Sequence, residues 1–121
     1  MTYPVTLTSQ AQGDVLRERE RQVYEEGWTE DHDDGHDGGE LAAAALAYLG
    51  TTVLTRVLIS KGRFAADPAV HQSMEPPSIW PWERHWWKPK DERCDLVRAA
   101  ALIIAEIERL DRLEARKAGA A

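Results

Sequence analysis

The feature that most constrains the fold is a long apolar segment, residues 40–62, which reads ELAAAALAYLGTTVLTRVLISKG. Its first half, residues 41–49, is apolar almost all round, and this predicts a helix that is buried among other helices. The alanines allow close approach of neighbouring helices, and Gly62 supplies the left-handed residue that commonly follows a helix end. We therefore expect the other helices to pack around this one.

Two further helices are predicted on either side of this segment. The first starts at residue 9 or 14 and ends near residue 26, with Gly27 as its C-terminal cap. The other runs from about residue 89 to 117, because apolar side chains recur there at helical spacing. The sequence thus predicts an all-α fold, a bundle of about three long helices. The short first helix cannot cover the apolar faces of the other two, so we expect dimerisation to complete the bundle.

The chain of 121 residues is long enough for one domain, which we place at residues 1–121. Within it, residues 1–8 are expected to be flexible and residues 115–121 to form a frayed tail. The connection at residues 63–88, called the aromatic loop below, holds four of the five tryptophans. Because indole rings are costly to leave in water, we expect this loop to be ordered.

The charge and composition narrow the possible partners and the compartment. A net charge of −6 argues against broad binding to nucleic acid, which requires a clustered positive field. The start of the chain has no apolar region typical of a signal peptide, and no apolar run reaches the ~20 residues that cross a bilayer. Cys94 is the single cysteine, which excludes an internal disulfide. We expect a cytoplasmic protein, without a membrane partner.

The segment GWTEDHDDGHDGGEL, residues 27–41, concentrates six acidic side chains and two histidines. Imidazole and carboxylate groups together suit zinc, manganese or iron, and carboxylates with water suit magnesium. Gly35 and the aspartates make a helix here improbable. A structural alternative is a solvated cap, because Asp37 and Glu40 match a capping box before the apolar helix.

A second acidic pair, Glu92 and Asp95, opens the last helix. Carboxylates that face one another from neighbouring helices build divalent-metal sites in helical bundles. If the two acidic helix starts meet at one end of the bundle, they form one site, with Glu26 as general base. We expect a divalent cofactor, magnesium or manganese and alternatively zinc. The candidate metal ligands are His32, Asp33, Asp34, His36, Glu40 and Asp95.

The motif WPWERHWWKPK, residues 80–90, interleaves aromatic rings with cations. Such rings stack on a base while the cations hold phosphates. We therefore assign Trp86 or Trp87 to base stacking, and Arg84 and Lys88 to phosphate. The alternative is that the rings cap an undersized helical core. With four tryptophans we expect both, one or two in the core and one or two in a pocket.

The segments EEGWTEDHDDGHDGGELAAAALAY, WPW, WWKPKD and LVRAAALIIAEIERLDR resemble a group of small phage and prophage proteins of uncharacterised function. More loosely, the chain is similar to the all-α MazG-like nucleotide pyrophosphohydrolases. That similarity implies carboxylates in Glu-x-x-Glu and Glu-x-x-Asp pairs, which bind magnesium for the cleavage of nucleoside triphosphates to monophosphate and pyrophosphate. Residues 92–95 fit the second pattern. The first helix contains no Glu-x-x-Glu, and the histidine-rich segment is not part of that family's usual site.

Three functional hypotheses follow from these residues. The first is a metal-dependent hydrolase of a nucleotide or related phosphate ester, in which metal neutralises phosphate charge and activates water. The second is a protein that sequesters a nucleotide or another phosphorylated small molecule without turnover. The third is a protein-interaction module that uses the tryptophans as a hot-spot patch. Loss of turnover without loss of ligand retention in a His32 and Asp33 variant distinguishes the first two. Exposed tryptophans in the isolated protein are expected only from the third.

Overall fold

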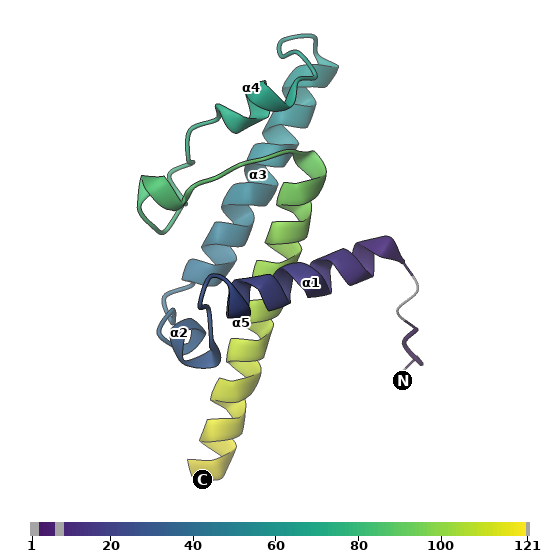
Figure 1. The fold of residues 1–121 in the computed structure, drawn as a ribbon. Helices are drawn as coiled ribbons and strands as arrows, with labels where there is room; N and C mark the ends of the chain where they lie inside the picture. The colour runs from purple at the N-terminus through teal and green to yellow at the C-terminus, as the bar shows by residue number, and fades with distance from the viewer. Residues whose placement is uncertain (1–2, 7–8, 121) are drawn as a thin grey trace.

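The computed structural model describes residues 3–6 and 9–120, and these residues form helices and loops without a strand (Figure 1). The predicted all-α fold with three long helices is confirmed. The long helices contain 15, 21 and 29 residues. In chain order the elements are α1 (Gln10–Tyr24), α2 (Glu30–Asp34), α3 (Glu40–Ser60), α4 (Pro68–Gln72), the 3-10 helix η1 (Arg84–Trp86) and α5 (Glu92–Ala120).

The long axis of the molecule is formed by α3 and α5, which lie side by side and antiparallel (Figure 1). Helix α1 crosses α5, and α2 lies beside the start of α3. The expectation that the other helices surround α3 was wrong, because α1, α2 and α3 all pack against α5. Both α3 and α5 carry fully buried alanines, such as Ala44 and Ala105, which let neighbouring helices approach closely.

The ends of the long helices follow local signals in the sequence. Ser9 begins α1 with a capping box, in which its Oγ accepts from the backbone N–H of Gln12 and the Gln12 side chain accepts from the Ser9 N–H. Gly27 and Gly62 follow α1 and α3 with φ angles of +75° and +70°. Both were predicted to end a helix in this left-handed conformation.

Two local predictions for the acidic segment were wrong. The N-cap of α3 is Gly39, at φ +87°, and no side chain caps it. Asp37 therefore does not form a capping box, and Glu40 instead accepts a hydrogen bond from the Gly38 N–H at 3.0 Å. Furthermore, residues 30–34 do form a short helix, α2. Its start is capped by Thr29, whose hydroxyl accepts from the backbone N–H of the third helical residue.

The core lies between α3, α5 and the aromatic loop, and the ordered loop contains α4 and η1. Helix α5 continues to Ala120, through most of the tail expected to fray, while residue 121 and residues 1, 2, 7 and 8 lie outside the described part of the chain. By length and composition alone α3 could cross a bilayer, but the central helix of a helical bundle meets the same criteria. The buried residues that form one core cluster are Leu41, Ala44, Ala45, Ala47, Tyr48, Trp87, Ala99, Leu102 and Ala105.

Candidate functional site

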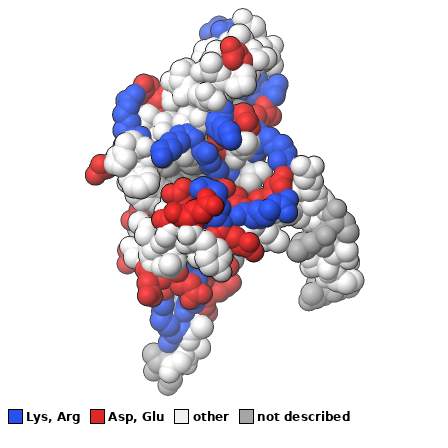
Figure 2. All heavy atoms as spheres, in the orientation of Figure 1, with Lys and Arg blue, Asp and Glu red and all other residues white. Residues whose placement is uncertain are grey.

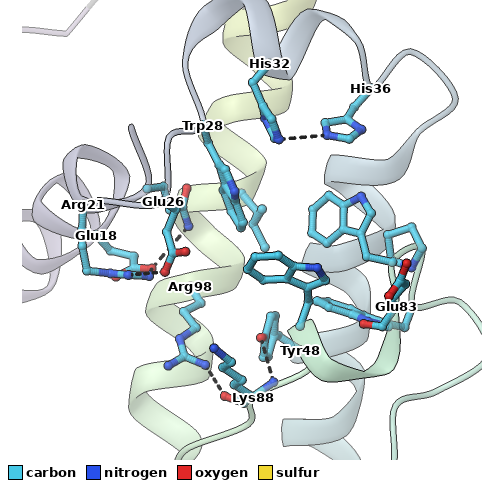
Figure 3. Close-up of a pocket in the computed structure, with 16 residues that line it drawn as sticks. Glu18, Arg21, Glu26, Trp28, His32, His36, Tyr48, Glu83, Lys88 and Arg98 are labelled. Carbon is cyan, nitrogen blue, oxygen red and sulfur yellow. Dashed lines mark hydrogen bonds and ion pairs between the residues drawn. The ribbon is translucent and has the colours of Figure 1, made fainter. Parts of the chain in front are cut away.

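A cleft of about 790 Å³ opens between α1, α3, α5 and the aromatic loop (Figure 3). Residues from each of these elements line it, together with His32 of α2 and residues on either side of that helix. Its size lies within the range of small-molecule sites, which are mostly ~300–1,000 Å³. Helices α1, α3 and α5 supply rigid walls, and the aromatic loop lies across the space between them.

The floor of the cleft is aromatic. The ring centroids of Trp28 and Trp82 lie 5.6 Å apart, and those of Trp80 and Trp82 lie 5.3 Å apart. Tyr48 of α3 continues the cluster, with its ring 5.5 Å from that of Trp80. The tilted and edge-to-face geometries are those that aromatic quadrupoles favour. The cluster thus lines the cleft with aromatic rings that are steeply inclined to one another.

The two tryptophans predicted to bind a ligand lie in different surroundings. Trp87 is buried in the core, where it stacks on Tyr48 with a centroid separation of 4.8 Å and donates its indole N–H to the Met74 carbonyl at 2.8 Å. Trp86 lines the cleft, is 47% exposed, and has the Lys88 Nζ 5.8 Å from its ring centroid. Trp87 therefore belongs to the core, and Trp86 belongs to the cleft.

The cations at the cleft are Arg21, Lys88 and Arg98. Arg98 donates to the Lys88 carbonyl, and its guanidinium carbon lies 5.5 Å from the Tyr48 ring centroid. Burial raises the pKa of the Tyr48 phenol, which therefore stays neutral near pH 7. Arg84, the other predicted phosphate ligand, does not line the cleft and forms an exposed ion pair with Glu75.

Two histidines approach one another at one wall of the cleft (Figure 3). The Nε2 atoms of His32 and His36 are 3.4 Å apart. Trp28 stacks on the His32 ring at 6.0 Å, and Trp82 packs against the His36 ring at 5.4 Å. Both rings are therefore held by neighbouring tryptophans with their Nε2 atoms side by side.

Asp33 fixes the tautomer of His32. Its Oδ1 lies 3.3 Å from the His32 Nδ1, and an ionised carboxylate can only accept, so we assign the proton to Nδ1. The Nε2 of a neutral His32 then carries a lone pair, which accepts a hydrogen bond from the His36 Nε2–H at 3.4 Å when no metal ion is bound. Asp33 is fully buried, and Arg19 donates to its other oxygen at 2.7 Å. A buried carboxylate that orients an imidazole in this way is common behind metal-binding histidines.

Asp34 connects α2 to the far end of α5. Its carboxylate forms ion pairs with Arg112 at 2.9 Å and Arg116 at 2.8 Å, and these hydrogen bonds hold its pKa below the ordinary value. Asp34 does not line the cleft. Acidic and basic side chains are likewise interleaved where α1 crosses α5 (Figure 2). Much of the acidity of residues 30–34 therefore attaches α2 to its neighbours.

The acidic wall of the cleft belongs to α1 and the residues after it. Arg21 bridges two carboxylates, with Nε 2.8 Å from Glu18 Oε1 and Nη1 2.6 Å from Glu26 Oε1 (Figure 3). These hydrogen bonds raise the pKa of the Arg21 guanidinium. Gln22 also lines the cleft and is almost fully buried, yet its Oε1 has no hydrogen-bond partner among the described residues. Such an acceptor requires a donor from water or from a ligand.

The structure does not bring Asp95 or Glu40 to the cleft. Asp95 is buried, with Oδ2 2.5 Å from the His71 Nε2, and it accepts from the Lys90 N–H at 3.2 Å. Burial raises the pKa of this carboxyl. Its neighbour in the Glu-x-x-Asp pattern, Glu92, forms an ion pair with Arg56 at the surface. Among the described residues, no group of three or more His, Cys, Asp or Glu is placed to hold one metal ion.

The sequence analysis missed several cleft residues, among them Arg21, Gln22, Trp28, Tyr48 and Arg98. A signal existed for Tyr48, because it is the one hydroxyl in the apolar run of residues 41–49, and for Trp28, which adjoins the acidic segment. Nothing in the local pattern distinguishes Gln22 or Arg98. Comparison of the chain with protein-family models, with curated proteins and with solved structures finds no match, so the function of the cleft has to follow from its own geometry.

Proposed function

We propose that the protein binds a nucleotide in the cleft and hydrolyses its phosphate chain with the help of a divalent metal ion. The observation that carries this proposal is the composition of one cavity. An aromatic floor, a set of arginine and lysine side chains, and a pair of histidines with adjacent Nε2 atoms all line the same space of about 790 Å³. A nucleotide presents the complementary groups, namely a planar base and a chain of anionic phosphates.

The base would lie on the aromatic floor. Stacking of a base on an aromatic side chain is worth roughly 1–3 kcal/mol. Lys88 and Arg98 would hold the phosphates as cations at the rim.

The two histidines fit a divalent ion. A nitrogen–nitrogen distance of 3.4 Å matches two ligands that lie about 2.0–2.1 Å from one ion in tetrahedral arrangement. Two imidazoles favour zinc over magnesium, and phosphate oxygens or water would complete the coordination. Such an ion would polarise a phosphoryl oxygen and lower the pKa of a bound water. Asp33 would keep the His32 Nε2 unprotonated.

Glu26 is the proposed general base, and it can accept a proton only after its ion pair with Arg21 is broken. In this structure Arg21 forms ion pairs with both carboxylates of the acidic wall, Glu18 and Glu26. An incoming phosphate competes with them for the guanidinium, because Arg binds phosphate in the same bidentate manner. Glu26 released in this way would accept the proton of the attacking water.

A second candidate function, sequestration without turnover, is favoured by one observation. Both carboxylates of the acidic wall are paired with Arg21, and only two imidazoles are placed for a metal. The cleft can therefore bind a nucleotide through its aromatic and cationic groups without activating water. The third hypothesis, a tryptophan interaction patch, is less favoured because Trp86 is the one tryptophan on the exposed surface.

The test incubates the protein with a mixed nucleotide pool in zinc, manganese or magnesium and separates free from retained nucleotides by ultrafiltration. New products in the filtrate that require metal support hydrolysis, whereas an unaltered nucleotide enriched in the denatured retentate supports sequestration. Lys88→Gln should weaken either effect, and Arg84→Gln is the matched control because Arg84 lies outside the cleft. A pool that is neither changed nor retained would contradict both functions.

A further inference from the structure

Helices α3 and α5 each carry a row of large apolar side chains that the rest of the fold leaves exposed. Their exposed fractions range from 37% to 54%. None of the side chains in these two rows is charged. We refer to the two rows together as the apolar face. Its members are Leu46, Leu49, Val53, Leu54 and Val57 on α3, and Leu96, Ile103, Ile107 and Leu110 on α5.

The spacing within each row is that of a helix-packing seam. On α5 the row is spaced at four, three, four and three residues when Ala100 is included between Leu96 and Ile103. On α3 the steps from Leu46 to Val53 are three and four. Alternation of three and four residues keeps a row on one side of a helix and is typical of helices that pack along a coiled-coil seam.

Both rows lie away from the cleft. Tyr48 and Arg98 line the cleft from α3 and α5 and contact one another. Val53 follows Tyr48 by five residues and Ile103 follows Arg98 by five, a rotation of about 140° around each helix at 3.6 residues per turn. Because α3 and α5 are adjacent, the two rows form one surface on the side opposite the cleft.

We propose that the apolar face is the interface of a homodimer, in which α3 and α5 of two copies form a four-helix bundle. Its exposed side chains amount to roughly 700 Å² per copy, close to the ~800 Å² that each partner of a standard interface buries. The largest apolar patch of a monomeric protein is ordinarily ~300–600 Å². Two antiparallel helices with apolar residues at this spacing make up half of a four-helix bundle. A two-fold axis would bring the same two helices of a second copy against them, apolar face to apolar face.

A second copy fits this face better than a bilayer does. For α3 to span a membrane, its other side, including Thr51, Thr52 and Thr55, would have to leave its packing in the fold. The Arg56–Glu92 ion pair between α3 and α5 would also have to break. A dimer leaves both intact and covers only the surface that is already exposed. The inference does not depend on what the cleft binds.

The experiment measures the mass of the full chain in solution by size-exclusion chromatography with light scattering. We expect twice the monomer mass of 13.6 kDa. The double variant Val53→Glu and Ile103→Glu should give the monomer mass, because it buries four carboxylates in the interface. Tyr24→Glu is the matched control, since Tyr24 is a strongly exposed apolar residue on α1, outside the apolar face, and this variant should remain a dimer.

A milder variant keeps the test valid if the double variant loses its fold, which circular dichroism would reveal. Ile107→Ala should retain its helix content and raise the dimer dissociation constant roughly tenfold. A native chain that is monomeric at micromolar concentration, or a dimer insensitive to these changes, would overturn the proposal. So would a monomer that sediments with phosphatidylcholine vesicles, an outcome that would assign the apolar face to a bilayer.

Discussion

The molecule contains two buried aspartates that each contact a histidine, and the two pairs have different surroundings. Asp33 lies 3.3 Å from the His32 Nδ1, and Asp95 lies 2.5 Å from the His71 Nε2. The other nitrogen of His71 lies 3.3 Å from the buried Thr55 hydroxyl, so both of its nitrogens are satisfied inside the fold.

By contrast, the His32 Nε2 points toward His36 at the wall of the cleft (Figure 3). The His32 side chain is 37% exposed, whereas that of His71 is 5% exposed. The same pair of residue types therefore serves the fold in one place and forms a candidate ligand site in the other. The two Asp–His pairs differ in the environment of the second imidazole nitrogen, and this environment cannot be predicted from the spacing of residues in the sequence.

The largest effect is expected for Asp95→Ala, which should remove about 3–5 kcal/mol from the free energy of unfolding. The substitution leaves the buried His71 ring and the Lys90 N–H without their acceptor. Chemical denaturation in urea measures the loss. Asp95→Asn should cost less, because its amide oxygen can still accept a hydrogen bond. If Asp95→Ala were as stable as the native chain, the Asp95–His71 pair would not be the structural one.

Asp33→Ala should cost about 2–4 kcal/mol and should also weaken nucleotide retention. The stability loss arises because Arg19 remains buried with only Glu108 as its ion-pair partner. The binding loss arises because His32 is no longer held in one tautomer. Urea denaturation and ultrafiltration on the same preparation separate the two effects. A variant that loses stability alone would place Asp33 with Asp95 among purely structural carboxylates.

His32→Ala should have the opposite signature, with less than about 1 kcal/mol of lost stability and at least a tenfold loss of metal-dependent retention or turnover. The ring is part of the cleft wall and not of the core. His85→Ala is the matched control, because His85 is exposed and lies outside the cleft, where it pairs with Glu83 and packs against the Trp86 ring. If both variants showed the same metal-dependent retention and turnover, the His32–His36 contact would serve only to pack the two rings.

The sequence predicted the helices better than the site, and particular residues show why. Helix ends such as Ser9 and Gly62 depend on a few neighbouring residues, so local rules identify them. The roles of Asp33 and Asp34 depend on arginines of other helices, the nearest to Asp34 being 78 residues away in the chain. The acidic residues of this one segment were therefore interpreted as a single metal site, although in the fold Asp33 and Asp34 pair with arginines of different helices.

The smallest effect concerns Asp34, and it tests whether its ion pairs only anchor α2. Arg112 and Arg116 hold its pKa below 3.8, so the folded state binds fewer protons than the unfolded state as the pH falls. The stability from Asp34 is thus fully present above that value and is lost as the pH drops through the folded pKa. Asp34→Asn should lower Tm slightly at pH 7, and the gap to the native chain should close in more acidic buffer. Asp95 should behave oppositely, because its pKa is raised by burial and its ionisation costs stability as the pH rises. A Tm gap for Asp34→Asn that persists in acid would mean that Asp34 stabilises the protein through contacts other than its charge.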